Sequence, residues 1–298
     1  MDQSLLVFIS VAEKQNFSRA AEELHMTQPA VSQYIQALER TIGTRLLERT
    51  NKYVRLNKAG EIVYHHAKEI TSLYSRMQGL VDDLLYENKG DLSIGASYTF
   101  GEYILPHIIA YLRQEYPLIK PNITIGNTKK IAELILAHQL DVGIVEGDFK
   151  HEDLSIEPFS EDHMFVIVSA HHPYAHLKEI QLSELTDETW IVRELGSGTR
   201  EATEKMFSEF HFFPKDIMEF GSTQIIKESV EAGLGITLLS HWAVKKEDSL
   251  GSLKLLKING NPIIRQFSIV KKDTEFHTKA TKVFLEILWK NKDLQAFR

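Results

Sequence analysis

The sequence contains no cysteine among its 298 residues, which excludes disulfide bonds, thiolate zinc sites and cysteine redox sensing. It also lacks a long apolar run near its start. The first apolar stretch, 5–12, is short, contains Ser10 and follows Asp2 rather than basic residues. We therefore expect neither an export signal nor a membrane span, and we predict a cytoplasmic protein with no membrane partner.

Recognisable catalytic motifs are missing as well. The glycines of 196–198 form neither a nucleophile elbow nor a phosphate-binding loop. His171, His172 and His176 surround the turn-forming Pro173 and have no carboxylate at ligand spacing, so a metal site is the less favoured interpretation. We expect no enzyme activity, no cofactor and no metal.

Composition indicates a globular protein of two ordinary domains. The chain is 43% hydrophobic and 25% charged, and its formal net charge is −7. This length is enough for two hydrophobic cores.

The segment 16–50 predicts two short helices joined by a tight turn. Ser18 can cap the first helix, and Thr27 can cap the second, with Pro29 in its first turn, where no amide donor is needed. The break between the two helices falls at 25–26. This pattern is typical of a helix-turn-helix.

The second of these helices has one apolar face and one polar face. Val31, Ile35 and Leu38 recur at helical spacing and should face a core. Amides and hydroxyls on the other face can bond base edges in a major groove. A solvated helix without a partner is the alternative. The polar face consists of Gln28, Ser32, Gln33 and Gln36.

Three neighbouring features favour DNA binding. Helix 3–14 carries an apolar stripe that completes a three-helix core. The segment 40–58 has six basic residues and one acid, a local charge of 6 − 1 = +5 in an acidic chain. Residues 46–47 and 53–56 flank a polar turn and predict a hairpin wing. The predicted DNA contacts are Ser18, Gln28, Pro29, Ser32, Gln33, Gln36, Arg49 and Lys52.

A long helix should follow over about 58–88, begun by an Asn57 cap and ended at Lys89-Gly90. At 1.5 Å per residue it would span about 45 Å. Apolar residues recur along it at alternating spacings of four and three, which is typical of a two-stranded coiled coil. We predict pairing with a second copy; packing on the C-terminal part of the same chain is the alternative. The seam comprises Val63, Ala67, Ile70, Tyr74, Met77, Val81 and Leu84.

From Asp91 onward, short β-like runs alternate with amphipathic helices in two successive rounds, which predicts an α/β region of two lobes with a cleft between them. The first round runs 92–96, a helix from Gly101, 123–126, a helix from Thr128, and 142–145. The second round runs 165–169, 190–193, a helix from Thr199, 218–220, a helix from Thr223, and 236–239, with 267–271 returning toward the first half.

Ligand contacts are expected where hydroxyl-bearing loops begin helices, because helix N-termini offer free amides to an anion. Ordinary capping is the alternative, and it is favoured at 127–128 and 222–223. Arg200 adds a charge but can instead pair with Glu204. The predicted contacts for an anionic metabolite are Ser97, Tyr98, Thr99, Thr128, Glu146, Ser197, Gly198, Thr199 and Thr223.

The run FSRAAEELHMTQPAVSQYIQALERTIGTRLLER, followed by VRLNKAG, resembles the N-terminal domain of LysR-type transcriptional regulators. Departures are mild: Leu47 stands where the family often has Phe, and 57–58 differ from its usual residues. The resemblance implies a winged helix-turn-helix over 1–57, a dimerisation helix over 58–90, and a periplasmic-binding-protein-like effector domain over 91–298.

By the same resemblance, the chain should cross between lobes near 146–160 and 265–272, and Ser97 and Thr99 should contact the effector. The protein should form a homodimer and further a homotetramer, bind an interrupted palindrome in double-stranded DNA, and act as an activator controlled by a small-molecule effector. The segment RELGSGTR is similar to members that regulate sulfur assimilation or carbon fixation. The competing functions are an enzyme or solute carrier with a DNA-binding-like appendage, and an architectural DNA binder with no effector.

Overall fold

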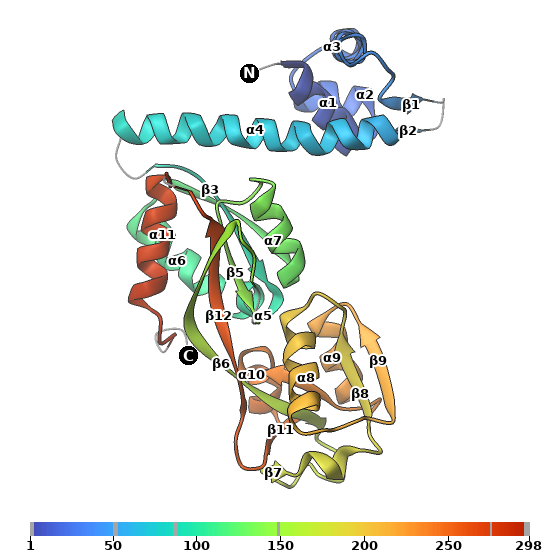
Figure 1. The fold of residues 1–298 in the computed structure, drawn as a ribbon, viewed down its shortest axis with the longest axis vertical. Coiled ribbons are helices and arrows are strands. Elements are labelled where there is room, and N and C mark those ends of the chain that lie inside the picture. Colours follow the sequence, from blue (N-terminus) through green and yellow to red (C-terminus); the bar gives the residue numbers. More distant parts are fainter. Residues whose placement is uncertain (1–2, 50–52, 86–88, 148–149, 275, 295–298) are drawn as a thin grey trace. The chain divides into compact units, whose positions relative to one another are not determined.

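The computed structural model describes residues 3–49, 53–85, 89–147, 150–274 and 276–294. The chain divides into two compact units, 1–85 and 86–298, and each is described by itself. The order of elements confirms a helical N-terminal region with a hairpin, a long helix and an α/β region (Figure 1). Within the described ranges, no helix combines the length and apolarity that crossing a membrane requires.

The first unit begins with helices α1 (Gln3–Lys14), α2 (Phe17–Glu23) and α3 (Gln28–Ile42). Their apolar faces enclose one core around Phe8, Val31 and Ile35, as the helical spacing predicted. Thr27 caps α3 by accepting a hydrogen bond from the amide of Ala30 at 3.4 Å. The three-helix prediction is therefore confirmed.

The predicted cap of α2 is wrong. Asn16, not Ser18, occupies the cap position, and its side-chain oxygen accepts from the amides of Ser18 at 2.9 Å and Arg19 at 3.1 Å. Asn and Ser are equally good caps, so residue type alone could not choose between them. Ser18 lies inside the helix with its side chain exposed.

Strands β1 (Leu47–Arg49) and β2 (Val54–Leu56) form the predicted antiparallel wing, and helix α4 (Lys58–Leu85) follows it. The Asn57 side chain caps α4 by accepting from the amide of Gly60 at 2.8 Å. A Cβ at Gly60 would lie 2.0 Å from the carbonyl oxygen of Leu46. Only glycine lets the first turn of α4 lie this close to the wing.

The two halves of α4 have different surroundings. In the first half, Val63 packs on the core of the unit and Ala67 is buried. Tyr64 and Lys68 both donate to Glu13 of α1, at 3.0 and 2.8 Å. The second half carries a stripe of apolar side chains that are each more than two-fifths exposed. These side chains are Ile70, Leu73, Met77, Val81 and Leu84. The seam open to a partner therefore starts at Ile70, three residues later than Ala67.

The second unit is built on one main sheet, whose order in the described residues is β4-β3-β5-β12-β6-β11-β7, with β10 also paired to β6. A parallel pair, β8 and β9, lies beside it. The strands are β3 (Gly90–Ser97), β4 (Ile119–Gly126), β5 (Val142–Glu146), β6 (Leu154–Ser169), β7 (Glu179–Ile180), β8 (Thr189–Arg193), β9 (Asp216–Phe220), β10 (Thr237–Ser240), β11 (Leu253–Ile258) and β12 (Ile263–Lys272).

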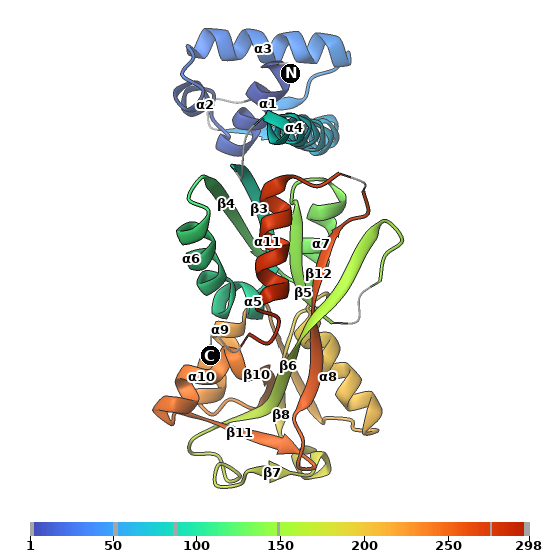
Figure 2. The same cartoon turned by 90° about the vertical axis from the view of Figure 1, so that its left-hand side faces the viewer.

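Two lobes share this sheet, because β6 and β12 run continuously from one lobe into the other (Figures 1 and 2). The first lobe contains β3, β4 and β5, and the second contains β7 to β11. Asp162 and Arg265 are paired in the β6–β12 register, close to where each strand passes between lobes. The β12 crossing lies at the start of the predicted 265–272. The β6 crossing comes just after the predicted 146–160, because 154–160 still pair with first-lobe β12 residues.

Helices cover the faces of both lobes. The predicted start of a helix at Gly101 is wrong: α5 begins at Tyr98 because Ser97 ends the strand directly at the cap position. Sequence patterns did not indicate α10, α11, β7 or β11. The helices are α5 (Tyr98–Tyr103), α6 (Leu105–Glu115), α7 (Thr128–Leu136), α8 (Gly198–Glu209), α9 (Thr223–Glu231), α10 (His241–Leu250) and α11 (Lys279–Lys290), with a 3₁₀ turn, η1 (Leu182–Leu185).

Candidate functional site

The polar face of α3 is open to solvent, as a DNA-contacting face must be. Gln33 and Gln36 are exposed, and Pro29 is exposed in the first turn. The Gln28 amide donates to the Ser32 hydroxyl at 3.0 Å, which orients both side chains without burying them. This contact joins residues four positions apart in the same helix, so it needs no partner from elsewhere in the chain.

The wing is held to α3 by a residue that sequence reasoning missed. Glu39 accepts from the amides of Leu46 at 2.9 Å and Leu47 at 3.4 Å. The same carboxylate lies 3.7 Å from Arg49, whose guanidinium stacks over the Phe17 ring at 4.4 Å. Arg49 is therefore positioned by local contacts. Predicted Lys52 lies outside the described residues.

Between the end of α3 and the wing lies a polar groove. Three arginine side chains lie along it, and their charges suit the phosphates of a nucleic-acid backbone. Its lining comprises Gln36, Glu39, Arg40, Gly43, Thr44, Arg45, Leu47 and Arg49. The groove joins the polar face of α3 to the basic segment that the sequence identified.

In the second unit, the predicted effector residues are brought to one region between the lobes. Seven hydroxyl and acidic side chains among them lie at the ends of β3 and β5 or the starts of α5, α7, α8 and α9. All are at least nine-tenths buried; they are Ser97, Thr99, Thr128, Glu146, Ser197, Thr199 and, on α9, Thr223. Tyr98 is half-buried beside them.

An arginine absent from the sequence prediction joins the two lobes. Arg265 donates to the Thr99 hydroxyl of the first lobe at 3.0 Å and to the Thr199 hydroxyl of the second at 2.9 Å. Its Nε donates to Asp162 at 2.7 Å, and Ser240 donates to the other oxygen of that carboxylate at 2.5 Å. The N-termini of α5 and α8 are therefore linked through one buried guanidinium.

The charges around Arg265 do not favour an additional anion. Glu146 also lies 3.9 Å from the guanidinium, so two carboxyl groups face one positive charge. Complete burial raises the pKa of Asp162, against the lowering effects of Arg265 and Ser240. The positive charge of Arg265 is therefore already balanced by carboxyl groups of the protein itself.

Close backbone packing explains the second glycine of the 196–198 loop. A Cβ at Gly198 would lie 2.2 Å from the carbonyl oxygen of Glu146 in the first lobe. The Thr128 hydroxyl donates to the same carbonyl at 2.9 Å. Glycine thus lets the start of α8 lie directly on the end of β5, which brings the two lobes together.

The other predicted residues divide between capping and lobe contacts. Ser97 donates to the carbonyl of Ile144 at 3.2 Å and makes no cap bond. Ser197 caps α8, and Asn127 caps α7, as predicted for that loop. The predicted Arg200–Glu204 pair is present at 2.7 Å.

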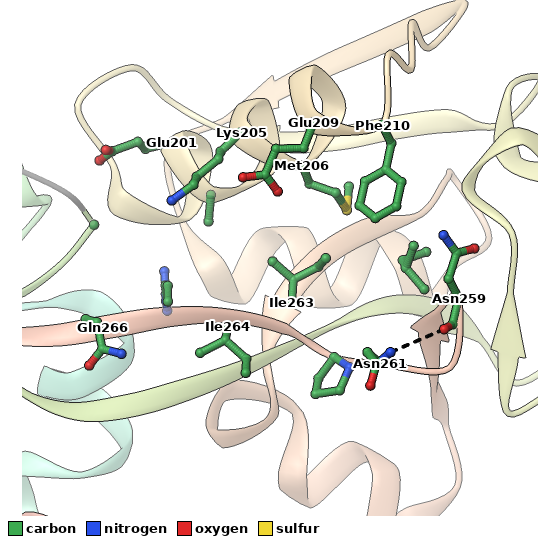
Figure 3. Close-up of a pocket in the computed structure, with 15 residues that line it drawn as sticks. Glu201, Lys205, Met206, Glu209, Phe210, Asn259, Asn261, Ile263, Ile264 and Gln266 are labelled. Atoms are coloured by element: carbon green, nitrogen blue, oxygen red, sulfur yellow. Dashed lines mark hydrogen bonds between the residues drawn. The ribbon is translucent and has the colours of Figure 1, made fainter.

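A pocket of about 540 Å³ lies between α8 and the β11–β12 region, and Arg265 forms part of its lining (Figure 3). Glu201, Lys205 and Glu209 of α8 line one side, and Ile263 and Ile264 line another. None of the predicted effector residues lines it. Its charged lining is mixed, with Glu201 and Glu209 against Lys205 and Arg265, which gives it no clear preference for an anion.

Comparison with known proteins places both units. Residues 3–61 match the model of bacterial regulatory helix-turn-helix proteins of the LysR family, and residues 87–292 match the LysR substrate-binding domain. The HTH-type transcriptional regulator CysL of Bacillus subtilis is 36% identical over 99% of this chain and 98% of its own length.

Two further proteins are similar. The HTH-type transcriptional activator CmpR of Synechocystis is 35% identical over 95% of this chain and 93% of its own. The structure of the Synechocystis CcmR regulatory domain in complex with 2-PG has a TM-score of 0.63 and 28% identity, and covers 70% of this chain and 99% of that one. The chain therefore belongs to the LysR family of DNA-binding transcriptional regulators.

Proposed function

We propose that a small anionic metabolite binds between the lobes of the second unit and changes how the first unit acts on DNA. The observation that supports this most is the Arg265 link between Thr99 and Thr199, because it joins helix N-termini of both lobes at one buried point. A ligand that enters beside this link, with its anionic group away from the two carboxyl groups at Arg265, must alter the lobe arrangement. A difference in affinity for two arrangements of about 1 to 3 kcal/mol is enough to bias them.

DNA contacts are proposed on the exposed face of α3 and on the wing. Gln28, Ser32 and Gln33 contact base edges, while Arg49 contacts phosphates. The target is an interrupted palindrome bound by paired copies. Pairing is proposed through the exposed stripe of α4, since apolar surface of this extent is buried in most soluble proteins.

We propose segment boundaries at 1–57, 58–90 and 91–298 for the DNA-binding domain, the pairing helix and the effector domain. The protein acts in the cytoplasm and catalyses no reaction, since the cleft side chains bond one another rather than forming an acid–base or nucleophile set. Activation rather than repression is proposed from the similarity to CmpR, a transcriptional activator.

The experiment tests effector response directly. A DNA fragment from beside the gene, including the promoter of any divergently transcribed neighbour, is footprinted with the full-length protein. 2-PG, the ligand of the CcmR domain, is the first probe, followed by other small anions. Calorimetry with the same anions measures binding. A protein with no response to any anion in either measurement would favour the architectural alternative.

A double variant then locates the site. Ser97→Ala with Thr199→Ala should keep DNA affinity and lose the ligand-dependent change in footprint. Thr186→Ala with Ser249→Ala removes two exposed hydroxyls of the second lobe and serves as the matched control. Normal sensitivity in the first double variant would contradict the cleft and favour the pocket in Figure 3.

A further inference from the structure

A second buried arginine, which the sequence analysis did not identify, lies between the two lobes. Arg193, the last residue of β8, is only 2% exposed. Its guanidinium stacks on the Tyr98 ring of the first lobe at 4.5 Å and donates to the Thr223 hydroxyl at 3.0 Å. An arginine does not lose its charge on burial, so this position requires an anion beside it.

The anion in this structure is the adjacent side chain, Glu194. Nε of Arg193 donates to one carboxylate oxygen at 2.7 Å, and NH2 donates to the other at 2.9 Å. Asn127 of the first lobe adds a third donor at 3.0 Å. Partial burial alone would raise the pKa of Glu194, but the bonds from Arg193 and Asn127 lower it overall. Three donors therefore form a binding site for one carboxylate.

The two members of this pair differ in access to water. The Glu194 side chain is 25% exposed, whereas that of Arg193 is 2% exposed. Water therefore reaches the Glu194 side chain, while the guanidinium is enclosed between Tyr98 and Thr223. Of the two, Glu194 is the member that an anion from solvent could displace.

Release of Glu194 would also loosen a contact between the lobes. The amide of Lys129 in the first lobe donates to the carbonyl of Gly196 at 3.1 Å, two residues after Glu194. Together with the Asn127 bond, this ties the 194–196 loop to the start of α7. A group that replaces Glu194 thus changes the tie between lobes.

We propose that the effector's anionic group is a carboxylate that takes the place of Glu194 on Arg193 and Asn127, so that the protein holds its own stand-in when no effector is bound. The inference rests on the proposed function and names the ligand class and the regulation of that site. The Arg265 end, with two carboxyl groups of its own, then receives the neutral or hydroxyl-bearing part of the ligand.

The test uses acetate and inorganic phosphate as probes on the full-length protein. Thermal unfolding is followed by tryptophan fluorescence, in buffers of equal ionic strength with chloride as the reference anion. Glu194→Ala leaves Arg193 without its anion, so acetate should raise its unfolding temperature, with an affinity at least about tenfold above that of the parent.

The matched control is Glu219→Ala, which removes a carboxylate 2.9 Å from Arg200 on the same lobe. Acetate should not stabilise this variant beyond the parent. Adding Arg193→Gln to Glu194→Ala should abolish the acetate effect. The inference is overturned if acetate stabilises Glu194→Ala no more than Glu219→Ala, or if the Arg193→Gln double variant responds as strongly as the single one.

Phosphate decides the ligand class. Tighter binding of acetate than of phosphate by Glu194→Ala supports the carboxylate, because the three donors of Arg193 and Asn127 cover two oxygens, whereas phosphate brings further charged oxygens that need donors of their own. Tighter binding of phosphate would overturn that assignment. These measurements use thermal stability alone, so their outcome is independent of the footprint experiment. A protein whose DNA footprint never responds to an effector could still bind acetate at this carboxylate site.

Discussion

The two units treat their functional side chains in opposite ways. In the first, Gln33 and Gln36 of α3 are exposed, and Gln28 bonds only Ser32, four residues away. In the second, the polar side chains are buried, and Arg265 bonds Thr99 across 166 residues of sequence. One surface is left open for a partner, and the other is closed on itself.

This difference bears on how each partner binds. DNA meets groups that are bonded mainly to water, so each contact adds to affinity at small cost. An effector must instead displace hydrogen bonds that the protein already makes, and only the surplus appears as affinity. Because those same bonds join the two lobes, binding at the proposed site would be coupled to a change in the arrangement of the lobes.

The largest expected effect is on pairing, and it comes from changing the exposed apolar stripe of α4 in the first unit. Ile70→Lys with Met77→Lys should weaken pairing by about 3 to 6 kcal/mol, since two half-exposed apolar side chains per copy lose their burial. This corresponds to at least about a hundredfold in Kd. Light scattering across a dilution series measures it, with Ser75→Lys, outside the seam, as the control. An unchanged dimer would assign pairing to the effector domains.

Next in size is the closed network of the second unit. Asp162→Ala leaves Arg265 buried without its closest anion and should cost about 3 to 5 kcal/mol of unfolding free energy. Asp187→Ala breaks an exposed pair with Lys215 on the same lobe and should cost less than about 1 kcal/mol.

Urea unfolding followed by tryptophan fluorescence suits this measurement, because the three tryptophans all lie after residue 189, in the second unit. Asp162→Leu combined with Arg265→Met removes this pair but leaves the buried Glu146 carboxyl without a cation, so it should recover only part of the loss. If Asp162→Ala is no less stable than Asp187→Ala, the buried link is not a structural element of the cleft.

A smaller effect tests base contacts on α3. Gln33→Ala should cost about 1 to 3 kcal/mol on the cognate site and little on random DNA, because a bidentate amide distinguishes adenine from other bases. Fluorescence anisotropy with both DNAs measures the difference. If the variant binds each DNA as tightly as the parent does, another face of α3 enters the groove.

The smallest effect concerns phosphate contacts from the wing. Arg49→Ala should weaken cognate and random DNA alike and reduce the slope of log affinity against log salt by about 1. Glu48→Ala, a neighbour that pairs with Arg55, is the control and should not lower the slope. A loss on cognate DNA alone would make Arg49 a base-contacting residue.

Local features of the fold could be predicted from the sequence, and long-range features could not. The α3 face, the wing and α4 follow from spacing within a few turns, as do the Thr27 and Asn57 caps. The cap at Asn16 was missed because two good capping residues stand two positions apart.

In the cleft, helix starts could be located, but their partners could not. Thr99 and Thr199 stood out as hydroxyls after strands, whereas Arg265 lies within a strand and has no local signal of function. Arg193 and Glu194 belong to the segment RELGSGTR, which was noted only for its similarity to other regulators. Their roles depend on Asn127 and Thr223, contributed by other parts of the chain.

The division of α4 has a consequence for the choice of operator. Its first half is fixed to α1 through Glu13, and its second half carries the stripe proposed to pair with another copy. If that stripe pairs as proposed, the two α3 helices of a dimer are held apart at a distance that α4 sets, and the number of base pairs between half-sites follows from it.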